Sequence, residues 1–237
     1  GMTAKQMKRR KPISQDYMLP IEPLTDNQKV MFDAWDEGKM IYAYGVAGTG
    51  KTFVALYKAL KEVLDDYSPY EKIYIVRSLV ATREIGFLPG DHEDKSSLYQ
   101  IPYKNMVQAM FEMPDDNSYE MLYDNLKAQE TISFWSTSFI RGTTLDNSIV
   151  IIDECQNLNF HELDSIITRV GQDSKIIFCG DAAQTDLQKI SERTGIIDFQ
   201  RILQNMEEFS MIEFGIEDIV RSGLVKSYLI NKINLGL

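Results

Sequence analysis

The chain has 237 residues, of which 44% are hydrophobic and 25% are charged, and its formal net charge is −10. This composition excludes a largely disordered chain, and the excess of carboxylates disfavours a surface that binds nucleic acid over its whole area. The length suits one large α/β domain. No apolar stretch approaches the roughly 20 residues needed to span a bilayer, so we expect a cytoplasmic protein with no membrane segment.

Cysteine and histidine are too few to indicate a metal centre. Cys155 and Cys179 lie inside or beside apolar runs and lack metal-ligand spacing, so we expect small buried side chains rather than a disulfide or a zinc site. His92 and His161 have no partner pattern. Catalysis by histidine is therefore not expected.

The first 24 residues differ in character from the rest. A basic run, Lys5 to Lys11, precedes three prolines at positions 12, 20 and 23. This pattern predicts a flexible basic arm over residues 1–24, which is either a local nucleic-acid contact or a solvated tail. Residues 25–237 then form the single domain.

From residue 25 onward, helical and strand patterns alternate. Thr25 offers an N-cap for a helix to about residue 37, and a strand over residues 40–44 leads through a glycine-rich loop into a helix over residues 51–64. Further strands are expected over residues 73–76, 131–135, 149–152, 176–179 and 211–214, and further helices over residues 102–113, 119–129, 161–170 and 196–204. Several strands are apolar without alternation, so the pattern predicts an α/β fold with a mostly parallel sheet.

Two segments between these elements have more than one interpretation. Residues 84–95 are broken by glycine and proline, and form either a functional loop or a plain surface connection. Tyr99, Tyr103, Met106 and Met110 repeat at helical spacing. We expect them in the core rather than in a platform that stacks on bases.

The loop between the first strand and the second helix carries the strongest motif. It fits the pattern G-x-x-x-x-G-K-[ST], and its residues are Gly45, Val46, Ala47, Gly48, Thr49, Gly50, Lys51 and Thr52. Its glycines let backbone N–H groups surround a phosphate, and the following helix adds its positive N-terminal end. Lys51 is expected to contact the β- and γ-phosphates, and the Thr52 hydroxyl to hold Mg²⁺. The motif predicts binding of ATP with Mg²⁺.

A second motif is an apolar strand, residues 149–152, that ends in Asp153 and Glu154. Alone, this pattern is often a solvated strand end. Together with the phosphate-binding loop it is a Walker B pattern, in which Asp153 serves the Mg²⁺ shell and Glu154 polarises the attacking water. The pair therefore predicts hydrolysis of the β-γ phosphoanhydride bond.

Two glutamines complete the predicted site. Gln184 ends a polar segment, residues 180–184, directly after an apolar strand, and its amide is suited to sensing the γ-phosphate or the attacking water; the alternative is a polar turn. Gln28 precedes the loop by about one helix. Its amide can both donate to and accept from an adenine edge, which favours ATP over GTP.

In this order, the segments resemble the motor core of the superfamily-one helicases. A finer resemblance, over about residues 21–227, is to the phosphate-starvation-inducible PhoH-like ATPases. The segments that carry it are IVRS (75–78), GFLPGD (86–91), IRGTTL (140–145), QTDL (184–187) and DIVRS (218–222). The resemblance implies a three-layer RecA-like P-loop NTPase core. In that core the strand ending at Cys179 lies between the strands that precede Gly45 and Asp153, which places Gln184 beside the γ-phosphate.

The resemblance also draws attention to arginines. Arg221 is a candidate arginine finger that stabilises the transferring phosphoryl group, or else a surface residue of a helix. Arg77, Arg83 and Arg141 fall in matching segments, either as phosphate contacts or as structural pairs.

Two functions stay open from the sequence. The first is a Mg²⁺-dependent ATPase acting on or with RNA or single-stranded DNA, as a homo-oligomer that supplies Arg221 across an interface. The second is a nucleotide-gated interaction module with slow turnover. A small-molecule kinase is weakly supported. We expect neither strand unwinding, which needs a second motor domain, nor RNA cleavage, which needs a nuclease domain.

Overall fold

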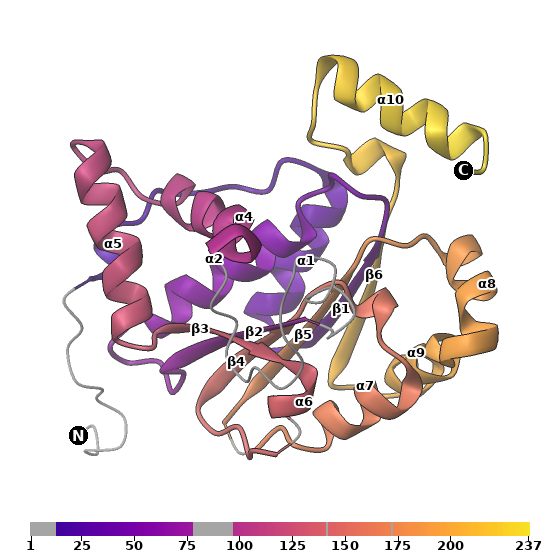
Figure 1. The fold of residues 1–237 in the computed structure, drawn as a ribbon, viewed down its shortest axis with the longest axis horizontal. Coiled ribbons are helices and arrows are strands. Elements are labelled where there is room, and N and C mark those ends of the chain that lie inside the picture. Colours follow the sequence, from indigo (N-terminus) through magenta and orange to yellow (C-terminus); the bar gives the residue numbers. More distant parts are fainter. Residues whose placement is uncertain (1–12, 78–96, 141, 172) are drawn as a thin grey trace.

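The strands expected from the sequence form one sheet in the computed structural model, which describes residues 13–77, 97–140, 142–171 and 173–237 (Figure 1). Over these residues the sheet has six strands in the order β3-β2-β4-β5-β1-β6, and each neighbouring pair is parallel. The strands are β1 (Met40–Gly45), β2 (Lys72–Arg77), β3 (Ile132–Ser136), β4 (Ser148–Ile152), β5 (Lys175–Gly180) and β6 (Phe209–Phe214). Every expected strand is confirmed, with ends shifted by one or two residues. The expected place of β5 between β1 and β4 is confirmed as well.

Helices cover both faces of the sheet, so the three-layer α/β fold is confirmed (Figure 1). One face carries α1 (Asp26–Asp36), α2 (Lys51–Val63), α4 (Ser97–Ala109) and α5 (Asp116–Ala128). The other carries α6 (Thr137–Ile140), α7 (Phe160–Ile167), α8 (Gln184–Thr194) and α9 (Ile196–Gln204). The last helix, α10 (Gly223–Asn234), stands apart from both layers.

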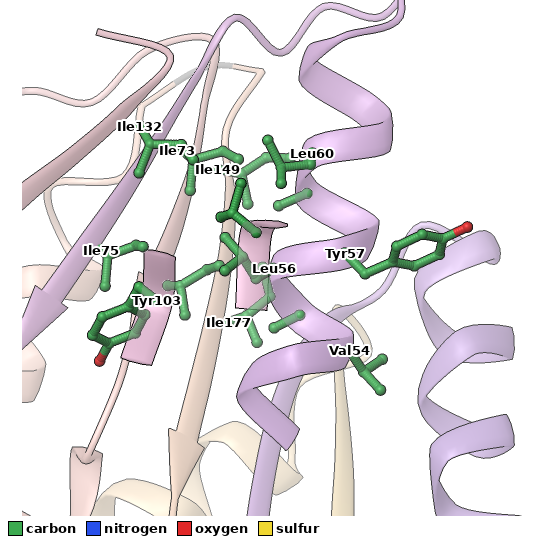
Figure 2. Packing of buried hydrophobic residues seen from close by; sticks show 14 of the residues in the cluster. Val54, Leu56, Tyr57, Leu60, Ile73, Ile75, Tyr103, Ile132, Ile149 and Ile177 are labelled. Carbon is green, nitrogen blue, oxygen red and sulfur yellow. The ribbon is translucent and has the colours of Figure 1, made fainter. Parts of the chain in front are cut away.

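The central strands alternate between two apolar cores. In β4, Ile149 and Ile151 pack with α2 and its neighbours, while Val150 and Ile152 pack with α7 and α9. All five residues of β4 are buried. This explains why the strand reads as a continuous apolar run, since successive side chains face opposite layers. Figure 2 shows the first core, with Leu56 and Leu60 of α2 beside Ile149 and Ile177 of the sheet.

Four helices of the described residues, α4, α6, α8 and α10, differ from expectation. The helix expected over residues 102–113 is α4, which begins at Ser97 and contains Pro102. Proline favours the start of a helix because it lacks an N–H donor, but here the helix continues through it. The sequence did not predict α6, which has only four residues, α8, which buries only Leu187, or α10, which buries no residue. In α10 no apolar face is buried, so no periodic pattern marks this helix.

Part of the segment expected to be a flexible arm contacts the domain. Ile13, Met18 and Ile21 pack against the first core. The Leu19 N–H donates to the carbonyl of Met110 at 2.8 Å, just after α4. Residues 13–24 therefore lie along the helical layer, while the basic run at residues 5–11 is outside the described residues.

Because all strands of the sheet run in one direction, their carboxyl ends meet at one edge. The loops that follow β1, β4 and β5 carry the phosphate-binding loop, the Asp153-Glu154 pair and the segment that leads to Gln184. In open parallel sheets this edge is where ligands bind. No helix in the described part of the chain is long and apolar enough to cross a membrane.

Candidate nucleotide-binding site

The loop between β1 and α2 takes backbone conformations that favour glycine. Gly45 has a φ of 122° and Gly50 a φ of 83°. A Cβ atom on Gly45 would lie 2.1 Å from the carbonyl oxygen of Phe214 in β6, and one on Gly50 would lie 2.6 Å from Nε2 of Gln28. A larger residue does not fit either position. The loop then leads into α2, whose first N–H groups lack partners within the helix and attract anions.

Lys51, the first residue of α2, is buried and lies back over this loop. Its Nζ donates to the carbonyl of Val46 at 2.7 Å and to Oγ1 of Thr49 at 3.1 Å. It also forms an ion pair with Asp181, at 2.9 Å. Asp181 follows β5 and is partly exposed, with 42% of its side chain accessible. The lysine charge is therefore held at the loop with a carboxylate as counter-ion.

Thr52 and Asp153 meet across the sheet edge. The Thr52 hydroxyl donates to Oδ1 of Asp153 at 3.0 Å, and the Tyr103 hydroxyl of α4 donates to Oδ2. Burial raises the pKa of the Asp153 carboxyl, whereas the hydrogen bonds from Tyr103 and Thr52 lower this pKa. The arrangement brings two oxygen-bearing side chains together beside the loop.

Glu154 is linked to the ion pair through a glutamine. Its backbone is left-handed, with a φ of 53°, so the chain turns sharply after Asp153. Gln156 donates from Nε2 to Oε2 of Glu154 at 2.8 Å, and its Oε1 accepts from the N–H of Asp181 at 3.2 Å. Burial and then the charges of Asp153 and Asp181 raise the pKa of Glu154. Gln156 therefore connects the loops that follow β4 and β5.

Gln28 lies against the phosphate-binding loop, with its amide bound on both sides. Nε2 donates to the carbonyl of Thr49 at 3.0 Å, and Oε1 accepts from the N–H of Leu24 at 2.9 Å. These bonds tie α1 to the loop. A role in reading adenine stays a prediction, since the structure gives the amide a supporting role in the loop itself.

An apolar pocket of about 240 Å³ lies next to Gly50 and Gln28. Its wall also includes side chains from α1, α2, α4 and the segments that flank the domain, among them Leu24, Phe32, Phe53, Met106 and Val220. The pocket is thus continuous with the loop on one side and apolar elsewhere. Its chemistry fits a flat, weakly polar ring better than a charged group.

The arginines singled out in the sequence lie in different surroundings. Arg221 is exposed, and its Cγ lies 3.3 Å from the position that a Cβ on Gly48 would take. The neighbouring Val220 N–H donates to the Gly48 carbonyl at 3.0 Å. The positive charge of Arg77, at the end of β2, lowers the pKa of both Asp153 and Glu154. Arg83 and Arg141 lie outside the described residues.

Gln184 is the first residue of α8, on the segment that follows β5.

The two cysteines are confirmed as buried and free. Burial raises the pKa of the Cys155 thiol to about 12. This leaves little reactive thiolate at neutral pH.

The donor atoms at the edge fit a magnesium ion that is shared with phosphate oxygens. In the described residues no group of three or more His, Cys, Asp and Glu side chains forms a site that could hold a metal alone. Mg²⁺ commonly takes one or two protein oxygens and completes its shell with phosphate and water. Thr52 and Asp153 supply such oxygens beside the loop.

Sequence reasoning missed three contributors. Tyr103 was expected only in the core, and its spacing carries no sign of its hydroxyl contact with Asp153. Asp181 lies within the segment 180–184, and Gln156 lies two residues after Glu154, but neither received a role. Their contacts join loops that are far apart in sequence, so spacing alone could not have found them.

This fold and this edge define a RecA-like P-loop NTPase core. Similarity to solved structures agrees: the large terminase from a thermophilic bacteriophage, in complex with ATP-γ-S, matches with a TM-score of 0.54 and 14% identity. The match covers 89% of this chain and 49% of the terminase chain. At this identity the likeness concerns the fold alone.

The family is defined by the sequence comparisons. Residues 20–231 match the family model described as PhoH-like protein, and the chain belongs to that family. The PhoH-like protein of Mycobacterium leprae is 32% identical over 206 residues, which cover 86% of this chain and 56% of that protein. The PhoH-like protein of Bacillus subtilis is 32% identical over 210 residues (85% and 60%), and Protein PhoH of Escherichia coli 29% over 212 (89% and 57%). The chain thus spans little more than half the length of these relatives.

Proposed function

We propose that this chain is a Mg²⁺-dependent ATPase. The observation that carries the proposal is the meeting of the α2 N-terminus with the end of β4, where the Thr52 hydroxyl lies 3.0 Å from Oδ1 of Asp153. In this proposal Lys51 releases Asp181 and contacts the β- and γ-phosphates. Thr52 and Asp153 hold Mg²⁺, which when bound neutralises charge on the β- and γ-phosphate oxygens.

Glu154 is the proposed general base for the attacking water. Its carboxylate is half-buried at the sheet edge, and Gln156 fixes one of its oxygens. A raised pKa makes the carboxylate a stronger base. Gln184, the first residue of α8, is proposed to sense the γ-phosphate.

The apolar pocket beside Gly50 is the proposed site of the adenine ring. It shares its wall with the loop, so a nucleotide whose phosphates lie on the loop can place its base there. Gln28 lines the pocket, and within the described part of the chain its amide keeps one unused donor and one unused acceptor position after its two bonds. A competition assay with a fluorescent ATP analogue tests this assignment. If GTP displaces the analogue at the same concentration as ATP, the assignment is wrong.

Arg221 is proposed to act within its own chain. Its stem lies against Gly48 of the same loop, which supports a contact with the phosphates of that site. Loss of turnover in Arg221→Ala that is not restored by mixing with Lys51→Ala protein would support this geometry. Restoration would instead support an arginine supplied between protomers of a homo-oligomer.

Coupling to RNA or single-stranded DNA in the cytoplasm is the finer part of the proposal. It is supported by the resemblance of the motif order to superfamily-one motor cores. Titration of each polymer into an ATPase assay at low and high salt tests it, because phosphate contacts weaken as salt rises. If neither polymer binds or changes the rate, the coupling is wrong.

A nucleotide-gated interaction module remains the second candidate, favoured by the surface of α10. This helix has no buried residue, and Leu224 and Tyr228 are 85% and 64% exposed. It begins three residues after the Val220 contact with the loop. Slow turnover that RNA and DNA do not stimulate would favour this candidate.

Two variants test the catalytic assignment directly. Lys51→Ala is expected to lose nucleotide binding, whereas Glu154→Gln is expected to bind ATP and lose hydrolysis, because only the base is removed. Phosphate release and binding of a fluorescent nucleotide are measured in parallel. If both variants release phosphate at the unaltered rate, the site is wrongly assigned.

A further inference from the structure

Tyr103 contacts the proposed metal site from outside the phosphate-binding motifs. It lies in α4, and 2% of it is exposed. Its ring packs edge-on against Phe134 of β3, with 5.3 Å between ring centroids. Figure 2 shows the ring beside Ile75, with the hydroxyl turned away from the aliphatic cluster. That hydroxyl donates to Oδ2 of Asp153.

The two oxygens of Asp153 have separate partners. Oδ1 accepts from the Thr52 hydroxyl and from the Glu154 N–H, both at 3.0 Å, whereas Oδ2 accepts from Tyr103. The strand fixes the Asp153 backbone, through its N–H bond to the Val76 carbonyl at 2.9 Å. The rotation of the carboxylate plane about its side-chain bond is instead fixed by these three donors. Tyr103, in α4, is the one that lies outside the phosphate-binding loop and the Asp153-Glu154 pair.

We propose that Tyr103 is a positioning residue for the metal site, which holds the Asp153 carboxylate in the orientation that receives Mg²⁺. This rests on the proposed function, in which Asp153 and Thr52 serve the metal. Partners that orient metal ligands commonly change metal affinity by about 10 to 100-fold when removed. Packing alone would not need the hydroxyl, because a phenylalanine would fill the same space.

The test is Tyr103→Phe, which keeps the ring and removes one oxygen. Tyr123→Phe in α5 is the matched control, because Tyr123 is also buried and its hydroxyl also bonds to a side chain, Gln100. Binding of a fluorescent ADP analogue is measured in EDTA and then at increasing Mg²⁺. Mn²⁺ binding to the protein with ADP is followed by electron paramagnetic resonance.

In Tyr103→Phe we expect the half-saturating Mg²⁺ and Mn²⁺ concentrations to rise about tenfold, while affinity for ADP in EDTA stays at the wild-type value. ATP turnover should fall at limiting Mg²⁺ and recover with excess Mg²⁺. The control should match wild type in every measurement.

The outcomes separate this inference from the function on which it rests. If wild-type protein binds nucleotide but metal changes neither binding nor turnover, the proposed metal-dependent function fails. If wild type responds to metal and Tyr103→Phe responds at the same concentration, the function stands and the role of Tyr103 is wrong. Equal shifts in Tyr103→Phe and Tyr123→Phe would also overturn it, since they would reflect general loosening of the helical layer.

Discussion

Nζ of Lys51 lies 2.9 Å from a carboxylate oxygen of Asp181, so the lysine expected to contact phosphate already has an anionic partner. A nucleotide must displace this carboxylate or accommodate it. The ion pair thus sets a competition between a protein anion and the incoming phosphates.

Asp181→Asn is therefore expected to tighten binding of ADP in EDTA by about threefold to tenfold. The substitution removes a negative charge near the phosphates and frees Lys51, and the effect should shrink at high salt because the carboxylate is partly exposed. A fluorescent ADP analogue titrated at two salt concentrations measures it. Weaker binding would mean that Asp181 holds Lys51 in its working position instead of competing for it.

Gln156→Leu is expected to lower kcat for ATP by about tenfold and to leave nucleotide affinity almost unchanged. The leucine removes the donor to Glu154 and the acceptor for the Asp181 N–H, but it does not touch the phosphate-binding loop. Asn157→Ala, at the exposed next position, is the control. A rise in KM without a change in kcat would assign Gln156 to binding rather than to the base.

Gly45→Ala is expected to destabilise the protein by about 3 kcal/mol or more, because the new Cβ would lie 2.1 Å from a backbone oxygen of β6. Gly38→Ala separates this overlap from backbone strain. Gly38 has a φ of 81°, but a Cβ there would meet nothing within 4 Å, so we expect a loss of only about 1 kcal/mol. Urea unfolding measures both. Equal losses would show that β6 moves aside.

Stability should depend on pH through Lys175, at the start of β5. Its Nζ lies 4.0 Å from the centre of the Trp35 ring. Burial lowers the pKa of Lys175 to about 8. The charges of Glu62 and Asp36 raise this pKa, and the charge of Lys58 lowers it further. Between about pH 8 and 10.5 the unfolded state then holds more protons at this residue than the folded state. The contribution of Lys175 to stability should rise with pH across this window.

Relative to Lys175→Met, the wild-type free energy of unfolding is therefore expected to rise by about 1 to 3 kcal/mol over that range. The comparison uses urea unfolding at several pH values. Lys61→Met removes an exposed lysine from α2 and should follow the wild-type profile. A constant difference between wild type and Lys175→Met would show that Lys175 is not desolvated.

Strand positions were accessible from the sequence because the parallel sheet is buried on both faces, which leaves runs such as residues 149–152 almost wholly apolar. The phosphate-binding loop could be predicted from the sequence because its glycines are required by the local backbone conformation. Contacts such as Tyr103 with Asp153 were not, since 50 residues separate the partners and tertiary packing alone brings them together. A helix without one apolar face, such as α10, could not be predicted either, because no periodic pattern marks it in the sequence.

The Val220 N–H that bonds to the Gly48 carbonyl connects the phosphate-binding loop mechanically to the start of α10. A loop that closes around phosphate must either break this bond or draw the chain at Val220 with it. Since α10 lies outside both layers, its Tyr228 is 64% exposed and the neighbouring Leu229 lies next to Gly48 of the loop, an environment-sensitive dye at position 228 provides an optical reporter of loop closure. The helix thereby offers a way to time nucleotide arrival and phosphate departure in single turnovers.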